Sequence, residues 1–221
     1  SLSTISDDNF FMEVRAAYAP AMVTGFIRLN GTTVGCVANR TASYDESGEK
    51  KAEYEAALTS RGCKKAADFV NFCDAFNIPL LTLVNVKGYA ASMCGEKHMA
   101  KSAGRLTYAF ADASVPKVTV IVGEAYGTAY LTMCSKSIGA DIVYAWPNAS
   151  IGMMDATVAA KIMYADEIAG ADDSVSLIQE KAAEYQALQS SAVAAAKRGY
   201  VDDIIEAVDT RKRVIAAFEM L

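Results

Sequence analysis

The chain has 221 residues, of which 52% are hydrophobic, and it carries a formal net charge of −5. A chain of this length and apolar content can bury a substantial core, so we expect one folded domain and no extensive disorder. The acidic balance argues against general nucleic-acid binding, because a surface that follows phosphates needs clustered lysine and arginine. We therefore interpret the short basic runs at 197–198 and 211–213 as solvated helix faces.

The cysteines and the apolar runs predict the cellular environment. The chain has five cysteines, Cys36, Cys63, Cys73, Cys94 and Cys134. None of them forms a Cys-x-x-Cys pair, and most lie among apolar residues. This pattern is typical of reduced, buried thiols. No apolar run is long enough to span a membrane, and the first residues lack the regions of a signal peptide. The sequence predicts a soluble, cytoplasmic protein. Its single histidine and unpaired cysteines give no metal site.

The first part of the chain predicts a β-hairpin and then a polar segment. Residues 22–29 and 33–38 are β-rich, and Asn30-Gly31 between them is the dipeptide best suited to a tight turn. Residues 41–62 are polar, and within them 46–58 predicts an exposed helical insertion or a mobile loop.

Alternating strands and helices follow the polar segment. Helical spacing over 63–76 precedes an apolar strand over 80–86, and a long helix is predicted over 96–114. The next strand, 118–122, is followed by a helix that begins at Thr128. This order predicts parallel strands that helices cover.

The remaining chain is mostly helical. Residues 141–146 predict a strand and 149–152 a short one, and helical spacing then resumes over 155–168. After a loop near 170–174, the pattern is helical to the end of the chain, with a break at Gly199. Several amphipathic helices at one end commonly pack on the sheet or on another subunit.

The stretch from Lys117 to Met133 is the strongest candidate for a ligand site. Gly123 and Gly127 loosen the backbone between a strand and a helix start, where unpaired N–H groups can hold an oxyanion. A similar turn contains Gly88. From the residues alone, the alternative is that these glycines only permit tight turns or close helix packing.

Other chemistries have weaker support. Ser92 and His98, with Asp112 or Asp141, could form a hydrolase triad, but no Gly-x-Ser-x-Gly elbow occurs, and a solvated serine and a surface histidine are the simpler interpretation. No dinucleotide-binding or Walker A glycine pattern is present. Four aromatic side chains could line a cavity or pack in the core: Tyr89, Tyr126, Tyr130 and Trp146.

Four segments in this order resemble the C-terminal half of biotin-dependent acyl-CoA carboxyltransferases: AADFVNFCDAFNI at 66–78, VPKVTVIVGEAYGTAY at 115–130, GADIVYAWP at 139–147 and RGYVDD at 198–203. The family includes propionyl-CoA and methylmalonyl-CoA enzymes and glutaconyl-CoA decarboxylase. The resemblance implies an α/β, crotonase-like ββα superhelix with additional C-terminal helices. It also implies that 1–221 is a single C-type domain with a polar insertion at about 41–62.

The implied activity is the transfer of a carboxyl group between carboxybiotin and an acyl-CoA, or a biotin-dependent decarboxylation. The implied cofactor is biotin on a biotin carboxyl carrier protein. An N-type carboxyltransferase domain or subunit is the implied partner, with the acyl-CoA at the shared interface of a homo- or hetero-oligomer. Two alternatives remain, which are a non-catalytic assembly subunit and a stand-alone crotonase-like acyl-CoA hydratase or isomerase.

The resemblance also assigns residues. It implies a backbone-amide oxyanion hole at Gly127, Thr128 and Ala129, in which the amides of Thr128 and Ala129 are the donors. The remaining implied substrate-binding positions are Gly88, Tyr89, Ala103, Gly104, Tyr126, Tyr130 and Leu131.

Three departures from the family pattern bear on these residues. The usual Gly-Gly-Ala-Tyr has Thr128 as its second residue, Lys87 replaces the proline of a Pro-Gly-Phe loop, and Lys101-Ser102-Ala103-Gly104 replaces Arg-His-Gly-Ala. A backbone donor survives a change of side chain, provided that the Thr128 methyl points away from the ligand. Leu131 lies where the family varies with acyl preference.

Overall fold

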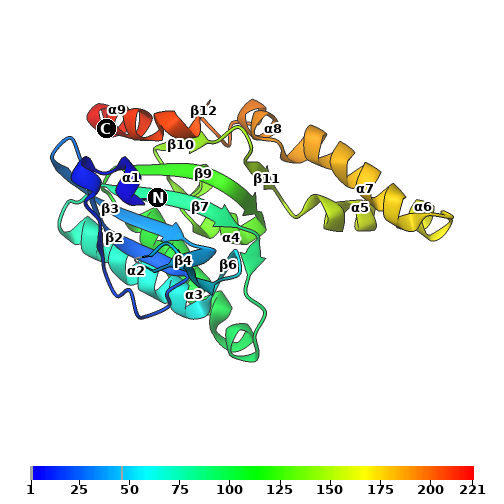
Figure 1. Ribbon diagram of the computed structural model, residues 1–221, viewed down its shortest axis with the longest axis horizontal. Helices are drawn as coiled ribbons and strands as arrows, with labels where there is room; N and C mark the ends of the chain where they lie inside the picture. Colours follow the sequence, from blue (N-terminus) through cyan, green and yellow to red (C-terminus); the bar gives the residue numbers. More distant parts are fainter. Residues whose placement is uncertain (1, 46) are drawn as a thin grey trace.

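A computed structural model of the protein describes residues 2–45 and 47–221, apart from the side chain of Cys94. Its centre is an eight-stranded sheet in the order β1-β2-β3-β7-β9-β10-β12, in which β11 also pairs with β9 (Figure 1). The bounds of these strands are β1 Met12–Glu13, β2 Met22–Leu29, β3 Thr32–Asn39, β7 Leu80–Val86, β9 Lys117–Tyr126, β10 Ile142–Ala145, β11 Ser150–Gly152 and β12 Asp203–Ile204. β1, β2 and β3 pair antiparallel, whereas the strands from β3 onward pair parallel.

The predicted hairpin is confirmed in β2 and β3. Their register brings Leu29 opposite Thr32, and the two turn residues both have positive φ, 50° at Asn30 and 80° at Gly31. Asparagine and glycine tolerate this left-handed region, which a type I′ turn requires at both central positions.

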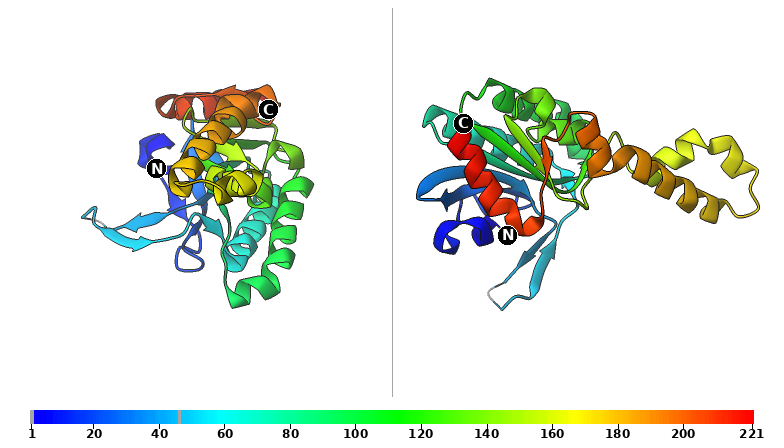
Figure 2. Two further views of the ribbon diagram at one scale, coloured as in Figure 1. Left: turned by 90° about the vertical axis from the view of Figure 1, so that its right-hand side faces the viewer. Right: turned by 90° about the horizontal axis from the view of Figure 1, so that it is seen from above.

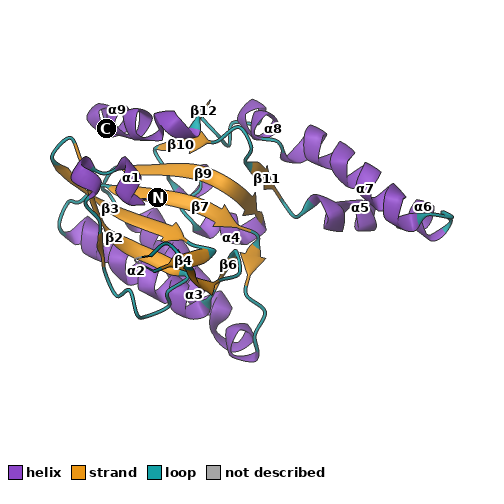
Figure 3. Cartoon of the chain, in the orientation of Figure 1, coloured by secondary structure: helices purple, strands orange, loops and turns teal. Residues whose placement is uncertain are grey.

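Helices cover both faces of the sheet (Figure 3). On one face, α2 (Ser60–Ala75) and α3 (Met93–Asp112) pack over a buried cluster that includes Val70 and Leu106. On the other face, α9 (Thr210–Met220) and α1 (Leu2–Ile5) bury Val214 and Leu2 against the sheet. The predicted α/β architecture is therefore confirmed.

Both long helices begin at a capping side chain. The Thr59 hydroxyl accepts a hydrogen bond from the Gly62 amide at 3.0 Å, and the Ser92 hydroxyl accepts one from the Gly95 amide at 2.9 Å. Such caps satisfy amides that the first helical turn leaves unpaired.

The helix predicted within the polar segment is wrong. The segment forms an antiparallel hairpin of β4 (Ala42–Tyr44) and β5 (Lys50–Glu53), which projects from the body in Figure 2, and then β6 (Ala57–Leu58), which pairs with β8 (Gly88–Tyr89). The Asp45 carboxylate fixes the turn by accepting hydrogen bonds from the Ser47 and Glu49 amides. An Asx-type turn of this kind overrides the helical propensity of the following residues. Glu46, the first residue of that predicted helix, lies outside the described residues.

The strand predicted over 118–122 is longer than its apolar run. β9 continues through Gly123 to Tyr126, so only Gly127 lies at a turn. At Gly123, a Cβ would lie 2.6 Å from Oδ1 of Asn85, where the β7–β9 register shifts between Val84 and Val86. Gly123 therefore makes room for a side chain at a bulge and does not bend the chain.

The C-terminal region forms a projecting arm and a helical connection back to the sheet. α5 (Ala156–Met163), α6 (Ala165–Ala169) and α7 (Ser174–Tyr185) project from the body as the arm (Figures 1 and 2). A π-helix, η3 (Gln186–Ser190), and α8 (Ala192–Lys197) connect the arm to β12, a strand that the sequence did not predict. The predicted break is confirmed, because Gly199 has a φ of 78°.

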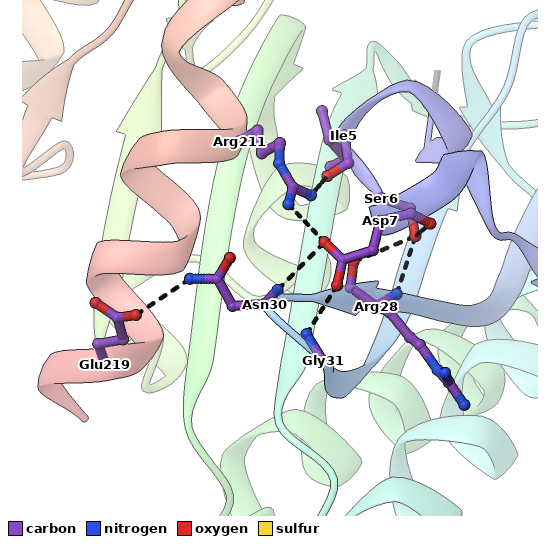
Figure 4. A network of polar contacts seen from close by, with 8 residues as sticks. All are labelled: Ile5, Ser6, Asp7, Arg28, Asn30, Gly31, Arg211 and Glu219. Carbon is purple, nitrogen blue, oxygen red and sulfur yellow. Dashed lines mark hydrogen bonds and ion pairs between the residues drawn. The ribbon is translucent and has the colours of Figure 1, made fainter.

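The first residues are tied to the hairpin turn and to the last helix (Figure 4). The Asp7 carboxylate accepts hydrogen bonds from the Asn30 and Gly31 amides at 3.2 and 2.8 Å and forms an ion pair with Arg211. Arg211 also donates to the Ile5 carbonyl. These contacts lower the pKa of Asp7, chiefly through the Gly31 amide.

The cysteine prediction is confirmed for four residues. Cys36, Cys63, Cys73 and Cys134 are buried free thiols. Among the described residues, no helix combines the length and apolar character that a membrane crossing requires.

Candidate functional site

The short helix α4 (Gly127–Thr132) begins directly where β9 ends. Gly127 has a φ of 57°, a left-handed backbone conformation that residues with a side chain rarely adopt, and the chain turns there. Tyr126, the N-cap residue, provides no side-chain cap, and its hydroxyl donates to the Ser150 hydroxyl at 2.8 Å. The first amides of α4 are therefore left without an N-cap side-chain acceptor.

A cavity of about 540 Å³ opens beside these amides, between the body and the root of the arm. We call it the arm-side cavity. Its lining residues come from α4, from η2 (Lys136–Ile138), from β11 and the residue after it, from α7 and η3, and from α8 and the residues after it: Gly127, Thr128, Tyr130, Leu131, Ser137, Ile151, Gly152, Met153, Tyr185, Gln189, Ala195, Arg198 and Tyr200. It is mainly apolar and aromatic, as ligand pockets usually are.

Arg198 is the one charged side chain among these lining residues. Its guanidinium donates to the backbone carbonyl of Gln189 at 2.9 Å and to the side-chain oxygen of the same residue. Arg198 is exposed, as expected for a basic run on a solvated face, whereas Arg211 is half-buried and binds Asp7, so that interpretation was wrong for Arg211. A fixed guanidinium in a cavity without a lining carboxylate favours an anionic ligand group.

A second cavity of about 600 Å³ lies on the other side of α4, against α3. This α3-side cavity is lined by Tyr89, Glu96, Met99, Ala100, Ala103, Gly104, Thr107, Thr128, Leu131, Thr132 and Ile138. Thr128 and Leu131 line both cavities. α4 is thus a wall between an arm-side cavity with a cation, Arg198, and an α3-side cavity with a carboxylate, Glu96.

The candidate residues from the sequence divide among these places. Gly127, Thr128, Tyr130 and Leu131 line the arm-side cavity, and Tyr89, Ala103 and Gly104 line the α3-side cavity. The other three residues line neither cavity. Gly88 of β8 pairs with Ala57 of β6, and Ala129 and Tyr126 are buried. For Ala129, only the backbone amide is relevant to the predicted role.

Sequence reasoning missed the residues that the arm and α8 contribute. Arg198 begins the RGYVDD segment, and this segment supported only the resemblance. Tyr185 and Gln189 carried no local signal, because they reach the cavity only through the return of the arm to the body.

Tyr130 is the tyrosine that combines cavity lining with deep burial. Burial raises the pKa of its hydroxyl to about 12, so the group stays protonated at neutral pH and keeps its hydrogen for donation. Burial also raises the pKa of Tyr126, whose hydroxyl is bonded to Ser150.

Two of the weaker interpretations are now resolved. Trp146 is partly buried, packs against the core cluster and donates its indole N–H to the Thr210 hydroxyl of α9 at 3.0 Å, and it lines neither of the two cavities. Ser92 caps α3, His98 on that helix is exposed, and Asp141 accepts a hydrogen bond from the Lys117 amide. These residues do not form a hydrolase triad.

A family model described as a carboxyl transferase domain matches residues 2–221. The chain belongs to the carboxyl transferase domain family. It is 41% identical over 220 residues to the methylmalonyl-CoA carboxyltransferase 12S subunit of Propionibacterium freudenreichii subsp. shermanii, covering 99% of the chain and 40% of that protein. It is 38% identical over 221 residues to the methylmalonyl-CoA decarboxylase subunit alpha of Propionigenium modestum, covering 100% of the chain and 41% of that subunit.

Solved structures of carboxyl transferase domain proteins share this fold. The crystal structure of the transcarboxylase 12S hexamer with hydrolyzed methylmalonyl-coenzyme A bound is 43% identical and matches with a TM-score of 0.89. The match covers 99% of the chain and 40% of that structure. The fold is crotonase-like, as the resemblance implied, and the chain spans about 40% of the length of these relatives.

Proposed function

We propose that this carboxyl transferase domain is the biotin-facing half of an acyl-CoA carboxyltransferase or biotin-dependent decarboxylase. In this proposal it transfers a carboxyl group between carboxybiotin and an acyl-CoA, and it is active only with an N-type partner domain. Residues 1–221 form the C-type domain. The observation that carries the proposal is the start of α4, where Gly127 and Thr128 line a cavity whose one charged lining residue is Arg198.

The amides of Thr128 and Ala129 are the proposed oxyanion donors. Carboxyl transfer places negative charge on an oxygen of each reactant, and preorganised N–H groups in a cavity stabilise such charge strongly. The positive end of a helix supports the same role, although α4 has only six residues and a small dipole. The left-handed turn at Gly127, with a φ of 57°, separates these amides from the end of β9.

The arm-side cavity fits a small bicyclic ligand such as biotin. Its volume of about 540 Å³ lies within the range of about 300–1,000 Å³ that is usual for small-molecule pockets. Tyr130, Tyr185 and Tyr200 supply aromatic walls, and the α4 amides suit a ureido oxygen. Biotin, when bound on its carrier protein, supplies the carboxyl group.

We assign the carboxylate of the reactant to Arg198. Guanidinium groups bind carboxylates through charge-assisted hydrogen bonds, and Gln189 holds this one at the cavity wall. Only two of the donors of Arg198 are used by Gln189, so further N–H groups remain for a ligand.

The arm supports the proposal of an N-type partner. Apolar side chains on it are exposed, among them Val158, Ile162, Met163 and Val175. An exposed apolar surface on a projecting element is typical of a protein interface. An N-type domain that covers the arm would also close the arm-side cavity and bring the acyl-CoA to it.

The lining of the arm-side cavity disfavours a stand-alone hydratase or isomerase. Addition of water or movement of a proton needs a general acid and base near the substrate, and carboxylates are the usual choice in the absence of histidine. None of the described lining residues of this cavity is Asp, Glu or His. Carboxyl transfer by amide donors needs no such pair.

Reconstitution tests the proposal. The chain is mixed with an N-type partner domain, free biotin and a malonyl-type CoA, and the release of CO2 is measured together with complex formation. We expect decarboxylation that depends on both proteins and on biotin. Complex formation without decarboxylation under any condition would instead identify a non-catalytic assembly subunit, whereas turnover by the chain alone would identify a stand-alone enzyme.

A further inference from the structure

Three hydroxyl groups from three different elements meet at the α3-side cavity. Tyr89 of β8 places its hydroxyl 3.1 Å from the Thr132 hydroxyl of α4, and the Thr107 hydroxyl of α3 donates to the same oxygen at 3.2 Å. The Thr132 hydroxyl donates to the Thr128 carbonyl at 2.9 Å. All four residues line this cavity.

The direction of each hydrogen bond follows from counting protons. A threonine hydroxyl has one hydrogen to donate and two lone pairs that accept. Thr132 uses its hydrogen on the Thr128 carbonyl, so Tyr89 must be the donor in the Tyr89–Thr132 contact. Thr132 then accepts from Tyr89 and Thr107 and donates to Thr128, which satisfies its hydroxyl completely.

This arrangement anchors the first turn of α4 from outside the helix. A threonine that donates to the carbonyl four residues earlier is common in helices and alone indicates nothing special. Here two donors from separate elements converge on that threonine, and such a chain of hydrogen bonds polarises and strengthens each member. A helix of six residues is marginal by itself, so external contacts decide how rigid it is.

We propose that Tyr89 and Thr107 are positioning residues, which act through Thr132 to hold the first turn of α4 and the amides that it presents. The proposal rests on the proposed function only for the role of those amides. It also gives a reason for the hydroxyl of Tyr89, which stands where the family pattern has phenylalanine. The second glycine of that pattern is replaced by Thr128, the residue whose carbonyl receives the anchor.

Hydrogen exchange tests the anchor without any need for activity. Tyr89→Phe removes only the donor, Thr132→Val removes the central hydroxyl, and Thr132→Ser retains it. Exchange of a peptide covering 127–135 is measured in the whole protein. Loss of one net hydrogen bond corresponds to roughly a two- to tenfold change in the opening equilibrium. We expect about this acceleration in Tyr89→Phe and Thr132→Val, and near-normal protection in Thr132→Ser.

The double variant and a matched control make the result specific. Because Tyr89 acts through Thr132, Tyr89→Phe should add nothing to Thr132→Val. Tyr108→Phe removes a hydroxyl from the next residue of α3, whose side chain is 69% exposed, and should leave the exchange of 127–135 unchanged. Unchanged exchange in Tyr89→Phe, or additive effects in the double variant, would overturn the proposal.

Steady-state kinetics of the complex connect the anchor to the amides. Donors that act mainly in the transition state should lower kcat and leave KM nearly unchanged, so we expect a kcat about two- to tenfold lower in Tyr89→Phe. Faster exchange with unchanged kcat would overturn the link to the amides. If the wild-type complex transfers no carboxyl group, the proposed function fails, and the exchange data alone still decide whether the anchor exists.

Discussion

Gly127 faces the carbonyl oxygen of Met153 so closely that a Cβ on the glycine would lie 3.0 Å from that oxygen. The two residues lie at the start of α4 and just after β11, and both line the arm-side cavity. The positive φ of Gly127 adds to this constraint. Two independent features thus require glycine where the proposed donors begin.

Gly127→Ala should lower the free energy of unfolding by about 1–2 kcal/mol, because a side chain in the left-handed region costs about this much before any contact with Met153 is considered. Gly127→Val should cost more and should slow turnover of the complex by narrowing the turn. Gly48→Ala is the matched control, because Gly48 also has a positive φ, 83°, whereas nothing lies within 4 Å of its Cβ position and it lines neither cavity. Chemical denaturation and steady-state kinetics measure both effects, and unchanged kinetics in a folded Gly127→Val would count against a ligand at this turn.

Gly104→Ala should stabilise the protein by about 1 kcal/mol, because alanine is the better helix former by that amount. Gly104 lies inside α3, and a Cβ there would meet no atom within 4 Å. The equivalent change in α2, Gly62→Ala, should destabilise the protein, since its Cβ would lie 3.0 Å from the Thr59 hydroxyl that caps the helix. Thermal unfolding of both variants gives the comparison. A destabilised Gly104→Ala would contradict the open space around the Cβ position of Gly104.

Gly123→Ala should destabilise the protein by about 1–3 kcal/mol, the usual cost of overpacking. The new methyl would collide with the Asn85 side chain, whose Oδ1 accepts a hydrogen bond from the Glu124 amide at 3.0 Å. In an Asn85→Ala background the same change should cost clearly less. Denaturation of the four proteins in this cycle measures the coupling, and equal costs in both backgrounds would contradict the contact.

Arg198→Gln should raise KM for the carboxylated substrate by about tenfold or more, since a hydrogen bond between charged groups contributes about 1.5–3 kcal/mol. Arg198→Lys should recover part of this loss. Because Arg198 also holds Gln189, Gln189→Ala separates the two roles by removing the clamp and keeping the charge. Lys197→Gln removes the neighbouring cation, which does not line the arm-side cavity, and its kinetics should be normal. A normal KM in Arg198→Gln would refute the assignment.

The contribution of the Asp7 carboxylate to the stability of the protein should be lost in acid. Its pKa in the folded state is lowered from the ordinary 3.8 by the Gly31 amide and by Arg211. The stabilisation is therefore fully present above the unfolded pKa and is lost as the pH falls from 3.8 through the lower folded pKa. Asp7→Asn should lower the free energy of unfolding at neutral pH. The variant should also lose less stability than the wild type over that acid range. Asp8→Asn changes the same charge at the neighbouring residue and serves as control, and identical pH profiles for the wild type and Asp7→Asn would contradict this role.

Local pattern was sufficient for most of the fold. Asn30-Gly31 identified the hairpin turn, and the apolar runs identified β7 and β9, because these signals depend on neighbouring residues alone. The polar segment failed for the opposite reason: the Asp45 turn and the pairing of β6 with β8 outweigh the helical propensity of its residues. Gly123 was misjudged because the side chain that requires it, Asn85, belongs to another strand.

The sequence by itself determined that a strand ends at a glycine before a helix start, and its ordered motifs determined the family. Only the tertiary structure decided what surrounds that helix start. The crossing of the chain between β7 and β9 brings Tyr89, Thr107 and Thr132 together, and the return of the arm brings Arg198 to Gly127 and Thr128. Periodicity records which residues share a face of one element, whereas such meetings depend on packing between elements far apart in the chain.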